Sequence, residues 1–376
     1  MINFFSDKKF IYIIFVGIIL RFVSISLFAD AEVDNEWGIM LNNLETNKIL
    51  SVRSVNDIPV PNIFMPPLYP LFLYIIKIFF NNLETFLKAT FIVQFVLSVI
   101  TIFLSFKIFL ELFSKNISHI GAFAFAVFPL NVFAVSQISS ITLQLFLLNF
   151  FLLSYIRLFK KIDLINVIIF SISSGLLILL RGEFFLFVFL SLIYLQIKQK
   201  QIFKILFTTT LIILIISPYL YRNYVNFGVI TITKSSGYNL LKGNHPNTKV
   251  GGTGMFLNVE NVIPETKFEL EHLYSKGPII NHDLLKDQIL LNQAIKFIKE
   301  DPKKYINLYF KKFLSFTFFD LNSNYPNYYS FLHIFPKTIL SLTTLIGIIL
   351  IYNFKISISN YFILFYFANL GLFSFF

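Results

Sequence analysis

The sequence predicts an all-α polytopic membrane protein. Of its 376 residues, 56% are hydrophobic, 18% are aromatic and only 14% are charged, whereas a soluble domain carries about 25% charged residues. The net charge of +11 comes from lysines clustered between apolar runs, a pattern typical of membrane topology rather than of nucleic-acid binding. The chain has no cysteine, which excludes disulfides and cysteine-ligated metals.

The apolar runs predict the individual helices. The first run, 10–29, is interrupted only by Arg21 and indicates a retained first helix rather than a cleaved signal peptide. The other runs that we expect to form membrane helices are 89–110, 118–135, 142–159, 164–181, 183–197, 203–221, 336–353 and 357–376. The chain ends at Phe376 inside an apolar run, which is typical of a fragment that lacks later helices.

The run 67–80 opens with two prolines, carries Lys77 and is too short to cross roughly 30 Å of hydrocarbon. We expect it to lie at the interface, because most Lys and Arg of the short loops then fall on one side. The loops on that side, together with the N-terminus, are 111–117, 157–163 and 198–204. The acidic loop 30–87 falls on the opposite, external side.

This topology predicts three domains. A seven-helix transmembrane catalytic module covers 1–221 and includes loop 30–87, an external (periplasmic) loop domain covers 222–335, and further transmembrane helices cover 336–376. The external domain should be a soluble-like insertion of mixed α/β character. Its Gly-, Asn- and Thr-rich start, 231–254, suits short strands and turns.

The rest of the external domain should be helical. Apolar residues recur at helical spacing from Asp283 until Asp301-Pro302 ends the pattern. A second amphipathic run, 303–319, has the composition of a helix on a membrane surface.

Four acids follow the first helix directly, at Asp30, Glu32, Asp34 and Glu36. Carboxylates beside a hydrocarbon core lose hydration unless a cation, a proton in transit or a substrate hydroxyl meets them, so they mark a candidate functional site. The alternative is a solvated acidic loop kept outside by its charge.

Several motifs occur in a fixed order along residues 10–320. They are Asp34–Trp37 with Asn42–Leu44, Met65–Pro70, Leu179–Glu183, Pro218–Gly228, and Gly237–Pro246 followed by Gly251-Gly252. In this order and with this topology they resemble polyprenyl-phosphate-sugar-dependent glycosyltransferases of the GT-C fold, of the aminoarabinose-transferase and protein-mannosyltransferase type (families 39 and 83). The resemblance implies a GT-C helical bundle.

The resemblance also implies a reaction and its base. A sugar would move with inversion from a polyprenyl-phosphate donor to an external acceptor, a glycolipid such as lipopolysaccharide or a protein. A base must then deprotonate the acceptor hydroxyl. Asp34 lies three residues before the aromatic Trp37, as in the family, and Glu36 is the runner-up. Asp30 and Glu32 fit solvated loop charges better, and Tyr69 would contact substrate.

Two arginines fit the departing phosphate. Arg181 and Arg222 each end an apolar helix on the expected external side, and a fixed cation there would stabilise the leaving group. The alternative for both is snorkelling at a helix end. Arg21 suits structural pairing with Glu183 or a loop acid as well as it suits a ligand.

The external domain would supply Asn239, Asn244 and His245 to the substrate, although His245 also fits a hydrogen-bonding loop residue. Metal dependence is where the sequence departs from the family. The segment 136–144 lacks the second carboxylate that many relatives carry, so a divalent metal has weak support and no cofactor is certain. Met65 replaces the family's charged residue before the two prolines.

Two other function classes stay open. A transporter or flippase of lipid-linked sugars would share this composition but should show paired broken helices and intramembrane charges. A non-catalytic lipid-binding subunit would tolerate the missing carboxylate. In every case we expect a multi-pass protein of the inner (plasma) membrane that binds lipid and no nucleic acid.

Overall fold

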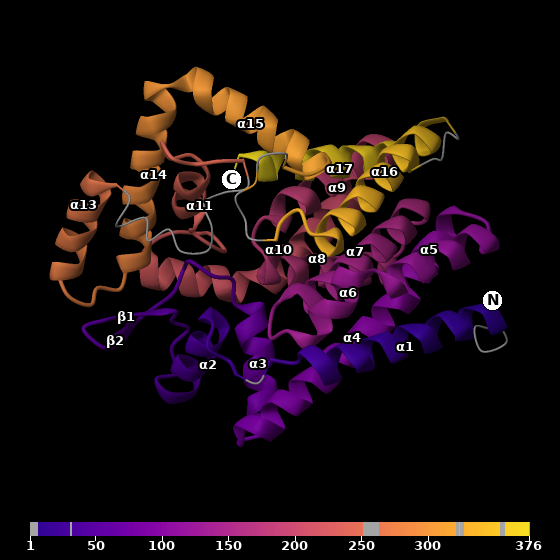
Figure 1. Ribbon diagram of the computed structural model, residues 1–376, viewed down its shortest axis with the longest axis horizontal. Helices are drawn as coiled ribbons and strands as arrows, with labels where there is room; N and C mark the ends of the chain where they lie inside the picture. Colours follow the sequence, from indigo (N-terminus) through magenta and orange to yellow (C-terminus); the bar gives the residue numbers. More distant parts are fainter. Residues whose placement is uncertain are drawn as a thin grey trace. The chain divides into compact units, whose positions relative to one another are not determined.

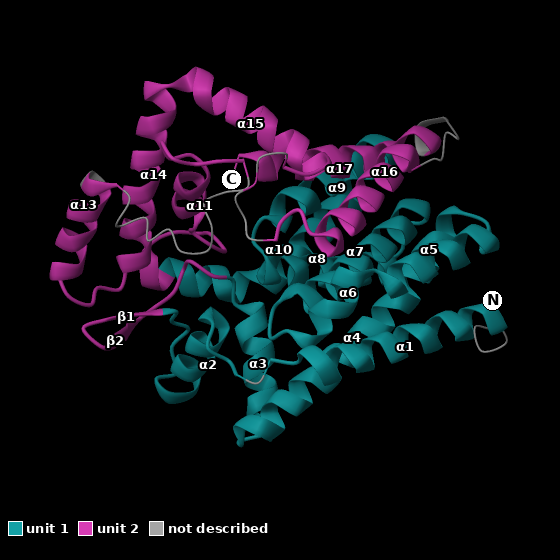
Figure 2. Cartoon of the chain, viewed as in Figure 1, with its two compact units in different colours: residues 1–52, 66–224 teal, residues 53–65, 225–376 magenta. Residues whose placement is uncertain are grey.

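The computed structural model describes residues 7–30, 32–250, 263–320, 323, 327–353 and 358–375. The chain forms two compact units, which Figure 2 shows in teal and magenta. Unit 1 comprises residues 1–52 and 66–224, and unit 2 comprises residues 53–65 and 225–376. The three topological domains expected from the sequence remain predictions about the membrane.

The secondary-structure elements of unit 1 among its described residues are all helices (Figure 1). Its elements are α1 (Lys8–Phe28), α2 (Glu36–Thr46), α3 (Leu68–Phe79), α4 (Leu83–Leu112), α5 (Lys115–Val127), α6 (Pro129–Phe133), η2 (Ala134–Ser136), α7 (Ile141–Lys160), α8 (Leu164–Leu180), α9 (Phe184–Gln199) and most of α10 (Ile202–Phe227). Helix α4 contacts α1, α5 and α7, and α7 contacts α8. This bundle carries the first part of the predicted membrane module.

The chain is a polytopic helical membrane protein. Among the described residues, α1, α4, α7, α10 and α16 (Phe331–Asn353) are long and apolar enough to cross a bilayer. Helices α8 and α9, where we expected further crossings, have 17 and 16 residues. Helix α3 has 12 residues, about 18 Å at 1.5 Å per residue. That length agrees with the expected interfacial helix, whose position in the membrane stays a prediction.

The run 118–135, expected as one straight helix, is broken. Helix α5 ends at Val127, and the segment Pro129–Ser136 continues at an angle of 54°. Pro129 has no N–H for the preceding turn and clashes with a continued helix. The carbonyls freed by the break find other donors: Asn131 donates to the Phe125 carbonyl and Arg21 to the Ala126 carbonyl.

Local capping signals set several helix ends. Asn82 accepts a hydrogen bond from the Glu84 N–H and begins α4, and Asp163 accepts from the Asn166 N–H and begins α8. The predicted stop at Asp301-Pro302 is confirmed, since α14 ends at Glu300 and α15 begins at Pro302. Pro302 is tolerated there because the first helical N–H has no partner within the helix.

Unit 2 contains one β-hairpin and six described helices. They are β1 (Arg53–Val55), β2 (Ile58–Val60), α11 (Ser236–Gly243), α13 (Pro264–Ser275), α14 (His282–Glu300), α15 (Pro302–Thr317), α16 and α17 (Ser359–Ser374). The strands are antiparallel with Arg53 opposite Val60. Asn56 and Asp57 make the turn with φ values of 50° and 63°, the left-handed conformation that a tight hairpin needs.

The mixed α/β character is present, but its strands come from another part of the chain. We expected strands in 231–254, and the structure places α11 there, with no strand up to Val250. Residues 251–254 lie outside the described residues. The strand signal was wrong because Gly, Asn and Thr also suit helix ends and close helix contacts.

Helices α11, α13 and α14 enclose the core of unit 2 (Figure 1). Its buried residues are Leu241, Ile263, Leu270, Leu273, Leu290 and Ala294. Gly237 lets α11 approach the α14 backbone closely, since a Cβ there would lie 2.0 Å from the Asp287 carbonyl oxygen. The Tyr238 N–H donates to the Asp287 carboxylate at 3.0 Å and holds the same contact.

The hairpin segment is attached to α14 by one buried acid. Asp283, 3% exposed, accepts a hydrogen bond from the Ile63 N–H and lies 3.5 Å from the Arg53 guanidinium. The Lys234 N–H donates to the Ile63 carbonyl at 2.7 Å. The segment 53–65, which lies between α2 and α3, is thus part of unit 2.

Candidate active site

The acidic segment is anchored to the turn that follows the broken helix. The Asp30 N–H donates to the Ser136 carbonyl at 3.1 Å, and the Asp30 carboxylate accepts from the Ile138 N–H at 3.0 Å. Gln137 donates to the Phe28 carbonyl at the end of α1. Asp30 is half-buried and Glu32 is exposed, so Asp30 is a partly solvated acid that also holds the backbone of the turn.

The two catalytic candidates lie at the start of α2. Asn35 caps this helix by accepting from the N–H groups of Trp37 and Gly38, and its own amide donates to the Ile138 carbonyl at 3.1 Å. Asp34 and Glu36 flank this cap, and both are exposed. The two carboxylates are therefore exposed on a turn that is held by hydrogen bonds at Asp30 and at Asn35.

Trp37 and Tyr69 pack edge to face with ring centroids 5.0 Å apart. Tyr69 has no exposed surface, and its hydroxyl donates to Gln94 of α4 at 3.2 Å. The Gln94 amide donates in turn to the carbonyls of Val135 and Gln137. Tyr69 therefore packs against the Trp37 ring from the buried side. Its expected contact with substrate stays a prediction.

The two phosphate candidates belong to unit 1. The expectation that Arg222 ends its helix is wrong, because α10 continues to Phe227. Arg181 follows α8, is half-buried and lies 3.3 Å from the Glu183 carboxylate. Arg222 of α10 is half-buried, donates to the Asn223 side chain at 2.8 Å and lies over the Tyr219 ring. We predict that both arginines face one cavity together with Asp34.

Arg21 does not make the expected ion pair with Glu183, whose carboxylate meets Arg181 instead. It is fully buried and donates to Ser98 Oγ at 2.6 Å, to the Gly17 carbonyl at 3.1 Å and to the Ala126 carbonyl at 2.9 Å. These neutral acceptors come from three helices. Arg21 therefore serves the packing of α1, α4 and α5.

The candidates in unit 2 are mostly occupied by internal hydrogen bonds. The Asn244 amide donates to the carbonyls of Leu240 and Phe375. His245 is 2% exposed, and its Nδ1 accepts from the Asn247 N–H. Burial, with Lys304 and Lys312 nearby, lowers the pKa of His245. These contacts fit the alternative interpretation of a hydrogen-bonding loop residue, and a contact of His245 with substrate stays a prediction.

Asn239 is half-buried, and its amide lies 3.5 Å from Ser235 Oγ. The structure gives no group of three or more His, Asp or Glu side chains placed to hold a metal among the residues it describes. We predict that the segment 237–252 partly covers the site; it is described only as far as Val250.

Two of the cavities near the candidate residues contain side chains that the sequence did not single out. One of about 580 Å³ lies in unit 1 between the end of α1 and the start of α4, and Asp30, Glu84 and Lys88 supply its charged groups. The signal for it was the position of Asp30 at the end of a membrane helix.

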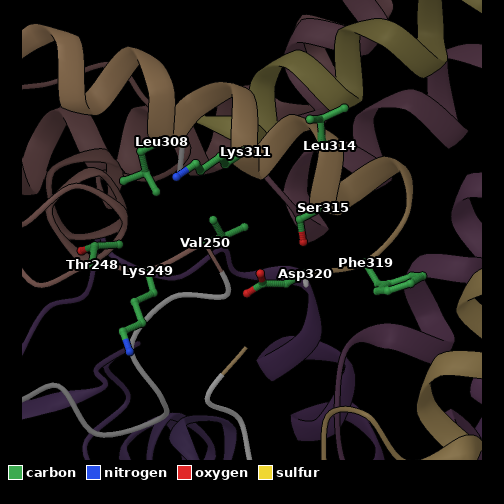
Figure 3. Close-up of a pocket in the computed structure, with 9 residues that line it drawn as sticks. All are labelled: Thr248, Lys249, Val250, Leu308, Lys311, Leu314, Ser315, Phe319 and Asp320. Atoms are coloured by element: carbon green, nitrogen blue, oxygen red, sulfur yellow. The ribbon is translucent and has the colours of Figure 1, made fainter. Parts of the chain in front are cut away.

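The other cavity lies in unit 2 beside α15 and has a volume of about 410 Å³ (Figure 3). Lys249, Lys311 and Asp320 are its charged lining residues, and Leu308 and Leu314 form an apolar wall. Lys311 had been interpreted only as part of an amphipathic surface helix.

Comparison with known proteins gives a single distant likeness to report. No protein-family model matches the chain, and no curated protein matches it. The crystal structure of the Archaeoglobus fulgidus oligosaccharyltransferase, tethered with an acceptor peptide containing the NVT sequon, aligns with a TM-score of 0.46 and 15% sequence identity. The alignment covers 93% of this chain and 39% of that protein. A likeness at this level assigns neither an activity nor a family.

Proposed function

We propose that the chain is a membrane glycosyltransferase of the GT-C type. It transfers a sugar, with inversion, from a polyprenyl-phosphate donor to an external glycolipid or protein acceptor. The observation that carries the proposal is the anchored turn at the start of α2, where Asp34 and Glu36 are exposed beside Trp37, directly after a membrane helix. A base placed there can meet a polar acceptor and a lipid-borne donor at one boundary.

In the proposed reaction Asp34 takes the proton from the acceptor hydroxyl. The acceptor oxygen forms a bond to the anomeric carbon while the bond from that carbon to the phosphate oxygen breaks, and the polyprenyl phosphate departs with the electron pair. Arg181 and Arg222 stabilise the charge that grows on the phosphate. Glu36, in the first turn of α2, lies where the helix N-terminus stabilises a negative charge, which suits a structural or acceptor-binding role.

Exchange of single carboxylates tests the assignment of the base. We expect Asp34→Asn to lower single-turnover transfer by about a hundredfold or more, the usual weight of general base catalysis, with donor affinity unchanged. Glu36→Gln should cost little. Glu45→Gln, at an exposed acid near the other end of α2, is the matched control.

Two outcomes would contradict the assignment in different ways. Loss of transfer in Glu36→Gln with a nearly normal Asp34→Asn variant would reverse the two roles. Normal transfer in both variants would remove the main support for a glycosyltransferase and favour a transporter or a lipid-binding subunit.

The phosphate role predicts a different kinetic signature. Arg181→Gln and Arg222→Gln should weaken binding of the donor lipid as well as turnover, because a cation near the phosphate acts in both the ground state and the transition state. Snorkelling side chains would leave donor affinity unchanged. Donor affinity is measured by titration of the purified variants with a polyprenyl-phosphate sugar.

The proposed orientation places the acidic loop on the external side of the inner membrane. Because the chain has no cysteine, single cysteines at Glu45 and Lys161 can be labelled in intact cells with a membrane-impermeant maleimide. We expect labelling at position 45 only. Labelling at position 161 only would invert the topology and overturn the external site.

A further inference from the structure

A groove in unit 1 lies far along α1 from the acidic segment, between the N-terminal ends of α1 and α5. These two helices are in contact, and the groove has a volume of about 580 Å³. Lys8, Lys9, Asn116 and His119 line its polar part. The proposed glycosyl transfer uses none of these residues.

The polar part of the groove carries excess positive charge. Burial alone would raise the pKa of Asp7, but hydrogen bonds from Lys115, the Phe10 N–H and His119 lower it to about 2. Asp7 is therefore ionised and already engaged, with Lys115 at 2.8 Å and His119 Nε2 at 3.0 Å. No carboxylate of the described chain lies within ion-pair distance of Lys8 or Lys9.

The helix ends also favour an anion here. Helices α1 and α5 both begin at this end of unit 1, so the positive ends of two helix dipoles coincide. His119 lines the groove as well, and its Nε2 is already engaged by the Asp7 carboxylate at 3.0 Å.

The other part of the groove is apolar and belongs to the membrane-facing surface. Tyr12, Ile120 and Phe123 line it with exposed fractions of 63%, 70% and 42%. Tyr12 lies about one turn from the start of α1, and Ile120 and Phe123 lie about one to two turns from the start of α5. A ligand that fits the groove therefore needs an anionic end and a hydrocarbon tail.

We propose that this groove binds one anionic phospholipid of the leaflet at the N-terminal end of α1, with its phosphate at Lys8 and Lys9 and an acyl chain along Tyr12, Ile120 and Phe123. Basic pockets between membrane helices are suited to acidic lipid headgroups. A zwitterionic lipid has the same tail but brings a cation to the lysines, so it should bind more weakly. The site is independent of the proposed transfer reaction.

The test titrates the full chain, purified in detergent, with phosphatidylglycerol, phosphatidylcholine or glycerol 3-phosphate and counts bound lipid by native mass spectrometry. Wild type should bind one phosphatidylglycerol preferentially. The double variant Lys8→Gln/Lys9→Gln should raise its Kd about thirtyfold, at roughly a factor of five for each lysine beside an anionic lipid. Lys198→Gln/Lys200→Gln, two basic residues at the end of α9, is the matched control and should bind as wild type does.

A second variant tests the tail. Ile120→Ser/Phe123→Ser changes two exposed residues, so the fold should persist, and it should weaken binding of phosphatidylglycerol by tenfold or more because an acyl chain loses apolar contacts. Equal Kd values for wild type and Lys8→Gln/Lys9→Gln would overturn the site. Equal affinity for phosphatidylcholine would overturn its charge selectivity, and binding of glycerol 3-phosphate as tight as that of the lipid would overturn the role of the tail.

Discussion

The contact between α11 and α14 makes a quantitative prediction for Gly237→Ala. The added Cβ would lie 2.0 Å from the Asp287 carbonyl oxygen and 2.8 Å from the Leu291 nitrogen, both backbone atoms that cannot rotate away. An ordinary carbon–oxygen contact is about 3.3 Å or longer, so the helices must separate by roughly 1.3 Å. Overpacking costs about 1–3 kcal/mol and loss of the Tyr238–Asp287 bond about 1 kcal/mol, while alanine gains about 1 kcal/mol of helix propensity. We therefore expect a net loss of about 1–3 kcal/mol.

The assay is thermal unfolding in detergent, with hydrogen–deuterium exchange to localise the effect. For 376 residues, with an unfolding entropy of about 2.1 cal/mol/K per residue, a loss of this size should lower the Tm by about 1–4 °C and reduce protection of α11 and α14. Gly347→Ala is the matched control, because the Cβ there meets no atom within 4 Å and alanine favours a helix by up to about 1 kcal/mol. A Tm for Gly237→Ala equal to that of Gly347→Ala would refute the close approach.

Two other predictions concern buried cations and imidazoles. Arg21→Met should lower the free energy of unfolding, measured by chemical denaturation, by about 1–3 kcal/mol, since the Ala126 carbonyl at the helix break loses its donor. A more stable variant would mean that desolvation of the guanidinium costs more free energy than its hydrogen bonds contribute. Because the pKa of His245 is lowered in the folded chain, the unfolded state takes up its proton first. The unfolding free energy should therefore fall as the pH drops below about 6.5. His245→Asn should flatten this dependence, and an unchanged profile would locate the titration elsewhere.

The helices could be predicted from the sequence because their signals are local. The length of the apolar runs predicted α1, α4 and α7, and the Asp301-Pro302 pair predicted the junction between α14 and α15. The break after α5 was missed, although Pro129 lies inside the predicted helix, because hydrophobicity continues across it. The hairpin at 53–60 was missed because its partner in space, Asp283, is far away in sequence.

The candidate site was predictable to a smaller extent. Placing Asp34 and Glu36 in an exposed turn needed only the order of helix, acids and tryptophan. The anchoring of Asp30 at Ile138 and the burial of Tyr69 depend on contacts between distant segments, which no local pattern encodes. Arg21 could be recognised as unusual, but which neutral acceptors surround it follows only from the packing of three helices.

The link between the hairpin segment and α14 sets an order of events during synthesis. Arg53 and Ile63 leave the ribosome long before Asp283, to which both are held in the finished chain. At about 5–20 residues per second, the hairpin waits roughly 10 to 45 seconds for its partner. During that time β1 and β2 lack their contacts with Asp283, and an isolated two-stranded hairpin is only marginally stable in water. Unit 2 is therefore a late-folding unit whose first component is made early.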